Sequence, residues 1–231
     1  MKNIRVGLLG GMSYESTLKY YQLFLEKYYE KEQNYSYPEI VIFSLNFQRV
    51  IDYELGGKLE EYINYLMEGI NFLQNAGVGF ILMAANSPHA VYEDLKKRTE
   101  VPILSIVKAA AEQARKDDMN KLLLLGIKFT MQSAFYKDEF RKFGMDVITP
   151  SNHEQDEIDK IIFDELVIGF FKQKSKQKLL DIIHKYEVDG VILGCTELPL
   201  ILQQKDTPLK LLDTIDIHVE YVLNYYMSLL I

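Results

Sequence analysis

Apolar and polar positions alternate in blocks that predict strands and helices in turn. Short apolar runs occupy residues 4–9, 39–45, 80–85 and 102–106, and between them apolar residues recur every three or four positions, as in 59–76. Strands buried in a parallel sheet are continuous apolar runs, whereas a helix that covers a sheet shows the 3.6-residue period. The first hundred residues therefore predict a βαβα order, with a parallel sheet packed between helices.

The second half of the chain repeats this order. We expect strands at 121–126, 145–149, 190–194 and 209–214. We expect a polar link at 151–157 and helices at 107–117, 131–143, 158–171, 175–186 and 215–231. The chain is therefore predicted to be an α/β protein with two similar halves.

The two halves are predicted to be separate domains that the chain crosses more than once. No Gly/Ser-rich linker separates them, so a flexible tether is not indicated. We expect an N-terminal domain of residues 1–105 plus 212–231 and a C-terminal domain of residues 106–211. Each is predicted to be a three-layer α/β/α unit with a mostly parallel sheet.

Two pairs of segments support an internal duplication. The apolar run that ends at Ala85 aligns without a gap with the run that ends at Cys195, and both continue into polar residues. The segment around Gly10 resembles the segment around Gly126 in the same way. A buried strand that delivers small and hydroxyl residues into a helix start is where open α/β sheets bind ligands. The aligned turns differ in one respect, because only one of them carries a thiol.

Composition narrows the classes of partner. With 48% hydrophobic residues the chain can bury a core in each half, and its formal net charge of −7 comes without a Lys/Arg cluster. Because neutralised phosphates supply most of the affinity for nucleic acids, a nucleic-acid partner is not expected. We expect a small molecule instead.

The remaining composition argues against a membrane protein and against a metal or disulfide framework. No apolar stretch approaches the ~20 residues that span a bilayer, and no signal-type segment is recognised, so a cytoplasmic protein is expected. Cys195 is the single cysteine, and no Cys-x-x-Cys or His-x-x-x-His spacing occurs. We therefore expect no internal disulfide and no metal.

Five motifs in order resemble the aspartate/glutamate racemase superfamily, in particular its amino-acid racemase branch, over almost the whole chain. They are Gly7 to Thr17 (GLLGGMSYEST), Asn86 to His89 (NSPH), Leu124 to Met131 (LLGIKFTM), Gly194 to Glu197 (GCTE), and Asp213-Thr214 with His218. The resemblance implies two pseudosymmetric domains, an active site in the interdomain cleft, no cofactor and often a homodimer. It also implies proton transfer at the α-carbon of a small amino or carboxylic acid.

The resemblance assigns catalysis to Cys195. In this family two thiols face opposite sides of the α-carbon, and Cys195 matches the second of them. A helix N-terminus and nearby donors can lower a thiol pKa from its ordinary value of about 8.5, so we expect Cys195 to ionise near neutral pH. A buried structural cysteine is the alternative.

The position of the first thiol holds Ala85. Some members of the family have threonine there, which can relay a proton, but a methyl group cannot. A two-base racemisation therefore lacks one of its bases unless a water molecule or another side chain replaces it.

The substrate-binding residues implied by the resemblance come from several turns. Asn86 and Ser87 match the residues that bind the α-carboxylate at a helix start, a natural anion site, although both are also ordinary helix caps. Glu197 either orients Cys195 or caps its helix. The full set expected to bind substrate is Met12, Arg49, Asn86, Ser87, Thr130, Thr196 and Glu197.

The distal group of the substrate is left open. Family members that act on dicarboxylates use cations from the loop after the second strand and from the helix that here contains residues 166–168. In this chain that helix face is apolar, and the loop offers Arg49, which either binds a carboxylate or lies in solvent.

We therefore predict a cofactor-independent amino-acid racemase that uses Cys195 as its acid/base. One alternative is a single-thiol decarboxylase, isomerase or lyase that acts on a related carboxylic acid. Another is a catalytically silent homologue that binds amino acids.

Overall fold

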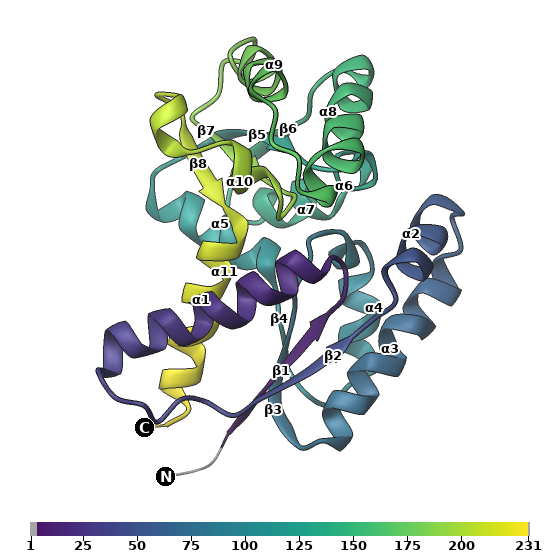
Figure 1. The fold of residues 1–231 in the computed structure, drawn as a ribbon, viewed down its shortest axis with the longest axis vertical. Coiled ribbons are helices and arrows are strands. Elements are labelled where there is room, and N and C mark those ends of the chain that lie inside the picture. The colour runs from purple at the N-terminus through teal and green to yellow at the C-terminus, as the bar shows by residue number, and fades with distance from the viewer. Residues whose placement is uncertain (1–3, 231) are drawn as a thin grey trace. The chain divides into compact units, whose positions relative to one another are not determined.

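A computed structural model describes residues 4–230, which divide into two compact units. The first unit runs to Ile106 and takes up the chain again from His218, and the second comprises Val107–Ile217. Each unit is built around one four-stranded parallel sheet (Figure 1). The two units are described separately.

The sheet of the first unit has the order β2-β1-β3-β4. Its strands are β1 (Arg5–Gly10), β2 (Ile40–Ser44), β3 (Val78–Met83) and β4 (Ile103–Leu104). All neighbouring strands are parallel, and Leu9 of β1 lies opposite Met83 of β3. The turns that follow β1 and β3 therefore leave the same edge of the sheet side by side.

Helices cover both faces of this sheet. They are α1 (Tyr14–Glu32), α2 (Phe47–Leu55), α3 (Leu59–Asn75), the 3₁₀-helix η1 (Ser87–Val91), α4 (Tyr92–Lys97) and most of α11 (Thr214–Ser228). Figure 1 shows α1 and α11 on one face and α3 with α4 on the other. This arrangement follows from right-handed crossovers, because the chain moves in opposite directions along the sheet after β1 and after β2.

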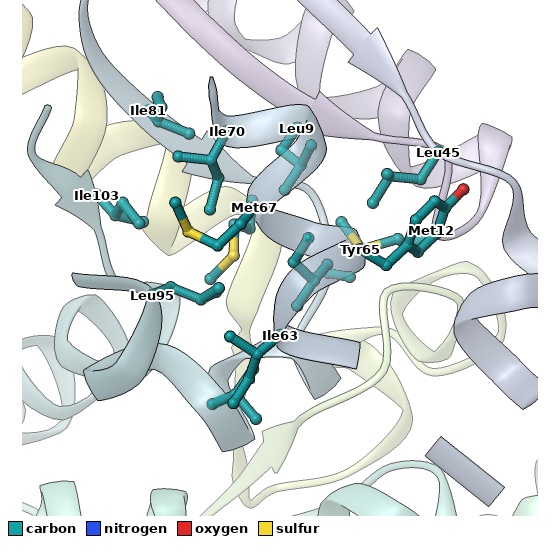
Figure 2. Close-up of a cluster of buried hydrophobic side chains, with 14 of the residues drawn as sticks. Leu9, Met12, Leu45, Ile63, Tyr65, Met67, Ile70, Ile81, Leu95 and Ile103 are labelled. Atoms are coloured by element: carbon teal, nitrogen blue, oxygen red, sulfur yellow. The ribbon is translucent and has the colours of Figure 1, made fainter. Parts of the chain in front are cut away.

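Alternating strand residues supply the core between the sheet and α3. Leu9 and Ile81 lie beside Ile70 of α3 (Figure 2), and Met83 and Leu66 belong to the same buried cluster. All five side chains are fully buried. Burial of each contributes about 1.5–3 kcal/mol, so this layer holds the end of β3 and the turn that follows it in place.

The second unit repeats this topology with the strand order β6-β5-β7-β8. Its strands are β5 (Lys121–Leu125), β6 (Asp146–Ile148), β7 (Gly190–Leu193) and β8 (Lys210–Asp213), all parallel. β5 takes the place of β1 and β7 the place of β3. The turns that align in the sequence therefore follow equivalent strands.

Short helices connect the strands of the second unit. They are α5 (Ile106–Lys116), α6 (Lys128–Gln132), α7 (Phe135–Arg141), α8 (Asn152–Asp164), the 3₁₀-helix η2 (Leu166–Ile168), α9 (Gln173–Ile183), α10 (Leu198–Ile201) and the 3₁₀-helix η3 (Gln204–Asp206). In Figure 1, α8 and α9 lie on the face of the sheet opposite α7. This is again the arrangement that right-handed crossovers produce.

The structure corrects several predicted elements. The helix expected at 131–143 is two helices, because Ser133 adopts an extended backbone and its hydroxyl donates to the carbonyl of Phe129. The link expected at 151–157 is mostly the first turns of α8, which Ser151 and Glu154 begin with a reciprocal capping box. Helix α2 was not predicted.

The boundary near the C-terminus also differs from the prediction at 211/212. Leu212 and Asp213 belong to β8 and pair with Ile192 and Leu193 of β7. The second unit therefore extends to Ile217.

Candidate functional site

In each sheet the chain runs to opposite sides of the first strand, toward β2 and β6 on one side and toward β3 and β7 on the other. This reversal places a candidate site at the carboxyl ends of the strands beside it. In the first unit the chain leaves β1 toward β2, whereas β3 lies on the other side of β1. In the second unit β5 has the same relation to β6 and β7. Ligands of open α/β sheets bind outside the carboxyl ends of strands at such switch points. The turns after β1, β3, β5 and β7 are therefore the turns to examine.

Cys195 lies two residues beyond β7, in a turn that is held tightly against the neighbouring strand. The backbone N–H of Gly194 donates to the carbonyl of Leu125 at 2.7 Å. A Cβ on Gly194 would lie 2.7 Å from Leu124 Cδ1 and 2.9 Å from that carbonyl oxygen, so only glycine allows this approach. The glycine fixes where the next residue, Cys195, leaves the sheet.

The thiol of Cys195 is joined to a carboxylate. Its Sγ donates to Oε2 of Glu197 at 2.9 Å, and the Thr196 hydroxyl donates to the same oxygen at 2.9 Å. Glu197 makes no side-chain capping bond to α10. Of the two roles considered for Glu197, the structure therefore shows the contact with Cys195.

The environment of this thiol favours its protonated form. Burial raises the pKa of Cys195 well above its ordinary value, and the negative charge of Glu197 and its hydrogen bond with the thiol raise it further. This shift of the Cys195 pKa is opposite in direction to the lowering expected from a helix N-terminus and nearby donors. In this structure the residue is 8% exposed and faces a carboxylate.

Thr130 lies beneath the same turn. It belongs to α6, which follows β5, and it is completely buried. Its Cγ2 methyl would be 3.7 Å from a Cβ built on Gly194, and its Oγ1 has no hydrogen-bond partner among the described residues. A buried hydroxyl without a partner costs free energy. Thr130 thus presents an unused polar atom close to the Cys195 turn.

The equivalent turn of the first unit contains Ala85, Asn86 and Ser87. Ala85 and Asn86 are buried and Ser87 is half-buried. Ser87 begins the 3₁₀-helix η1, and Asn86 makes no side-chain capping bond to it. The turn therefore brings polar groups to the carboxyl end of β3, whereas its Ala85 side chain is a methyl group.

Two buried histidines make hydrogen bonds at this end of the first sheet. Nε2 of His89 accepts a hydrogen bond from the backbone N–H of Ile106 at 3.2 Å, and burial lowers the pKa of His89 to about 4. His218 lies between the Tyr20 hydroxyl (2.9 Å) and the carbonyl of Leu104 (3.0 Å), and burial lowers its pKa to about 3. Both rings are neutral, and their acceptor nitrogens are already occupied.

A carboxylate that the sequence analysis did not assign reaches this turn. Oε1 of Glu54 accepts a hydrogen bond from the hydroxyl of Tyr62 at 2.6 Å, and the Ser87 hydroxyl also bonds to the Glu54 carboxylate. Desolvation raises the pKa of Glu54, against the opposing effect of these two donors. No pattern in the sequence marks Glu54, because the contact joins α2, α3 and η1, which are brought together by packing.

Two expected binding residues have other surroundings. The Met12 side chain is buried in the hydrophobic cluster close to Leu45 and Tyr65, as Figure 2 shows. The guanidinium of Arg49 lies 3.9 Å from the centre of the Tyr65 ring and donates to the Tyr53 hydroxyl at 3.2 Å. Arg49 is therefore held against tyrosines of α2 and α3.

Two absences hold for residues 4–230. No group of three or more His, Cys, Asp or Glu side chains is placed to hold a metal ion. Nor does this part of the chain contain a helix with the length and hydropathy needed to cross a membrane.

Comparisons with known proteins agree with this topology. Residues 9–222 match the family model described as Asp/Glu/Hydantoin racemase. The chain is 25% identical over 224 residues to the broad specificity amino-acid racemase RacX of Bacillus subtilis, covering 90% of this chain and 92% of RacX. It is 25% identical over 183 residues to the glutamate racemase of Aquifex aeolicus, covering 78% and 70% of the two chains.

A solved structure is similar over almost its entire length. PH1733 from Pyrococcus horikoshii OT3, described as an aspartate racemase homologue, superposes with a TM-score of 0.82 at 38% identity, covering 97% of this chain and 99% of that one. The chain belongs to the Asp/Glu/hydantoin racemase family.

Proposed function

We propose that the protein is a cofactor-independent racemase that transfers a proton at the α-carbon of a small amino acid, with Cys195 as its acid/base. The observation that carries the proposal is the buried thiol at the carboxyl end of β7, which donates to the carboxylate of Glu197. Family membership and the RacX relative, an amino-acid racemase of broad specificity, support the reaction class.

The pair of Cys195 and Glu197 can move a proton in both directions. As Glu197 takes the thiol proton, the thiolate becomes the base that removes the α-proton. A thiol whose pKa is raised yields a more strongly basic thiolate, which suits a weakly acidic C–H bond. In the reverse direction the protonated thiol protonates the carbanion, and Glu197 returns its proton to Sγ. Thr196 orients the Glu197 carboxylate by donating to the oxygen that Cys195 also uses.

The substrate carboxylate is proposed to bind to the polar turns. Asn86 and Ser87 bring polar side chains to the start of η1. Thr130 has a buried hydroxyl without a partner among the described residues. The roles of Met12 and Arg49 stay predictions from the resemblance, as do the homodimer and the cytoplasmic location.

The main alternative is a single-thiol reaction on one face of the substrate. It is favoured by Ala85, which cannot transfer a proton. A decarboxylase, isomerase or lyase would use Cys195 in this way, whereas a silent homologue would bind the acid without exchange.

Exchange of the α-proton with D₂O tests the proposal directly. The wild type should exchange the α-proton of at least one member of a panel of L- and D-amino acids, as followed by NMR. Cys195→Ala should lose this exchange by about 10²–10⁴-fold, the usual contribution of a positioned acid/base. Cys195→Ser serves as the size-matched control for folding and should also be slow. Full activity of Cys195→Ala would contradict the proposal.

A further inference from the structure

The turn after β5 is held in place by a carboxylate from another helix. Helix α6 begins at Lys128, and its N-cap residue, Ile127, makes no side-chain capping bond. The first N–H groups of a helix have no partner within the helix, so they need acceptors from outside it. Oδ1 of Asp159, in α8, accepts from the N–H of Lys128 at 2.6 Å. Asp159 therefore does for α6 what an N-cap side chain usually does.

A second aspartate of α8 bonds to the same lysine in a different way. The ammonium of Lys128 pairs with Asp156, which is exposed and lies one turn before Asp159. An exposed ion pair between flexible side chains contributes little to stability. Asp159 is half-buried and bonds the backbone, so it fixes the position of the helix itself. Of the two aspartates, Asp159 therefore determines where α6 begins.

The start of α6 determines where Thr130 lies relative to the Cys195 turn. A Cβ built on Gly126 would lie 2.9 Å from the carbonyl oxygen of Gly194 and 3.4 Å from Cγ2 of Thr130. The turn after β5 is thus packed directly against the residue that precedes Cys195. Thr130 is completely buried, and its hydroxyl has no hydrogen-bond partner among residues 4–230. A displacement of α6 would move this hydroxyl and loosen the packing beside the thiol.

Charge also relates Asp159 to the thiol. Burial and Glu197 raise the pKa of Cys195, and the negative charge of Asp159 adds to the same effect. The cation beside Asp159 is the Lys128 ammonium, whose pKa is raised by Asp156 and, to a smaller extent, by Asp159. Asp159 therefore lies within electrostatic reach of the proposed acid/base.

We propose that Asp159 is a positioning residue for proton transfer at Cys195, and that it acts through Thr130 by holding the turn after β5 against the turn after β7. This inference rests on the proposed function and adds to it a residue of α8 that no motif of the sequence indicates. The bond to Lys128 keeps α6 in place, and α6 in turn keeps the unpartnered hydroxyl of Thr130 available to the substrate carboxylate.

A double-mutant cycle tests whether Asp159 acts through Thr130. Thr130→Val keeps the size of the side chain and should lower kcat/KM for α-proton exchange by about 10- to 100-fold, as expected for a lost hydrogen bond to a carboxylate. Asp159→Ala should lower it by a similar factor, because displacement by about 1 Å has effects of this size. The double variant should lie within about threefold of the slower single variant. Effects that multiply, as those of independent residues do, or an unchanged rate in Thr130→Val would overturn the inference.

Asp159→Asn separates the hydrogen bond from the charge. Its amide oxygen can still accept from Lys128, so the full chain should fold and should lose no more than about threefold in exchange. The pH midpoint of iodoacetamide labelling of Cys195 should nevertheless move down, because a negative charge near the thiol is removed. Asp156→Asn is the matched control, since it removes a carboxylate of the same helix that pairs with the same lysine, and it should change neither measurement. Exchange as slow in Asp159→Asn as in Asp159→Ala would contradict a role through the hydrogen bond.

The remaining outcomes distinguish this inference from the proposed function. An unchanged labelling midpoint in Asp159→Asn overturns the inference even where Asp159→Ala does not fold, because it shows that Asp159 does not lie near the thiol. If amino acids exchange their α-proton while Asp159→Ala keeps the wild-type rate, this inference alone is wrong. If no amino acid exchanges its α-proton, the proposed function fails, and this inference with it.

Discussion

The turn after β3 and the turn after β7 occupy the same place in two sheets of the same topology, yet they carry different chemistry. The turn after β7 joins a thiol, a hydroxyl and a carboxylate within three consecutive residues, Cys195, Thr196 and Glu197. The turn after β3 has a methyl group at Ala85, and its carboxylate, Glu54, comes from a different helix through Ser87. Duplicated topology therefore does not imply duplicated function.

We expect the two turns to have different tasks, whereas in a symmetric racemase both turns would have the same task. The turn after β7 has a proton donor beside a proton acceptor, so it is suited to proton transfer. The turn after β3 has hydrogen-bonding groups and a negative charge without a thiol, so it is suited to holding the substrate.

Placing a thiol at position 85, in the turn after β3, should remove the chemical difference between this turn and the turn after β7. We expect Ala85→Cys to raise the rate at which L- and D-enantiomers interconvert by about 10²–10⁴-fold, because a second acid/base becomes available. In the wild type, exchange of the α-proton with D₂O should be much faster than interconversion for one enantiomer. Chiral chromatography and NMR exchange on the same samples measure both rates.

Ala84→Cys is the control, because it places a thiol in the neighbouring buried position, at the end of β3. It should leave interconversion at the wild-type rate. Equal and fast conversion of both enantiomers by the wild type would mean that another group already replaces the missing thiol.

Removing the Glu197 carboxylate from the turn after β7 should change both the pKa of Cys195 and the rate of α-proton exchange. Glu197 stabilises the protonated thiol through its charge, so Glu197→Gln should lower the pKa of Cys195. The pH midpoint of iodoacetamide labelling should therefore move down, while α-proton exchange falls by roughly 10²-fold because the proton acceptor is lost. In the wild type, labelling should rise only well above neutral pH.

Glu187→Gln removes an exposed carboxylate of the second unit and should change neither measurement. A labelling midpoint in Glu197→Gln at or above that of the wild type would disprove the role given to Glu197.

The smallest expected effects concern two threonine hydroxyls, one bonded to the end of β7 and one bonded to the turn after β1. Thr214 donates to the carbonyl of Leu193, which ends β7, at 2.8 Å. Thr214→Val should lower the free energy of unfolding by about 1–2 kcal/mol, because a buried carbonyl loses a donor.

In the first unit, Thr17 makes two such bonds. It accepts from the N–H of Gly11 and donates to the carbonyl of Ser13, both at 2.8 Å. Thr17→Val should therefore lower the free energy of unfolding in urea by about 1–3 kcal/mol. An unchanged free energy of unfolding would show that the β1 turn is held mainly by packing.

Much of the fold follows from local patterns in the sequence. The apolar runs at 80–85 and 190–194 predicted β3 and β7, and the period of residues 59–76 predicted α3. Parallel sheets and right-handed crossovers then allow few arrangements of the strands. The first turns of α8 were missed because residues 151–157 are polar, and there the capping box decides where the helix begins.

The sequence by itself also determined the family, because its five motifs are local, and a motif such as Gly194-Cys195-Thr196-Glu197 needs no contact from elsewhere in the chain. From the same resemblance it predicts that Cys195 is a catalytic thiol and that Ala85 stands at the position of a second one. Charge and composition likewise predict that nucleic acid is not a partner, since they depend on residue content and not on folding.

Only the tertiary structure decided the direction in which the pKa of Cys195 is shifted and the contact of Glu54 with Tyr62. Both depend on desolvation and on contacts whose energies change steeply over a few ångströms. Glu197 is two residues from Cys195 in the sequence, but its contact with the thiol depends on how the turn is folded. Glu54 and Ser87 are far apart in the sequence, and they meet because α2 and α3 pack beside the end of β3.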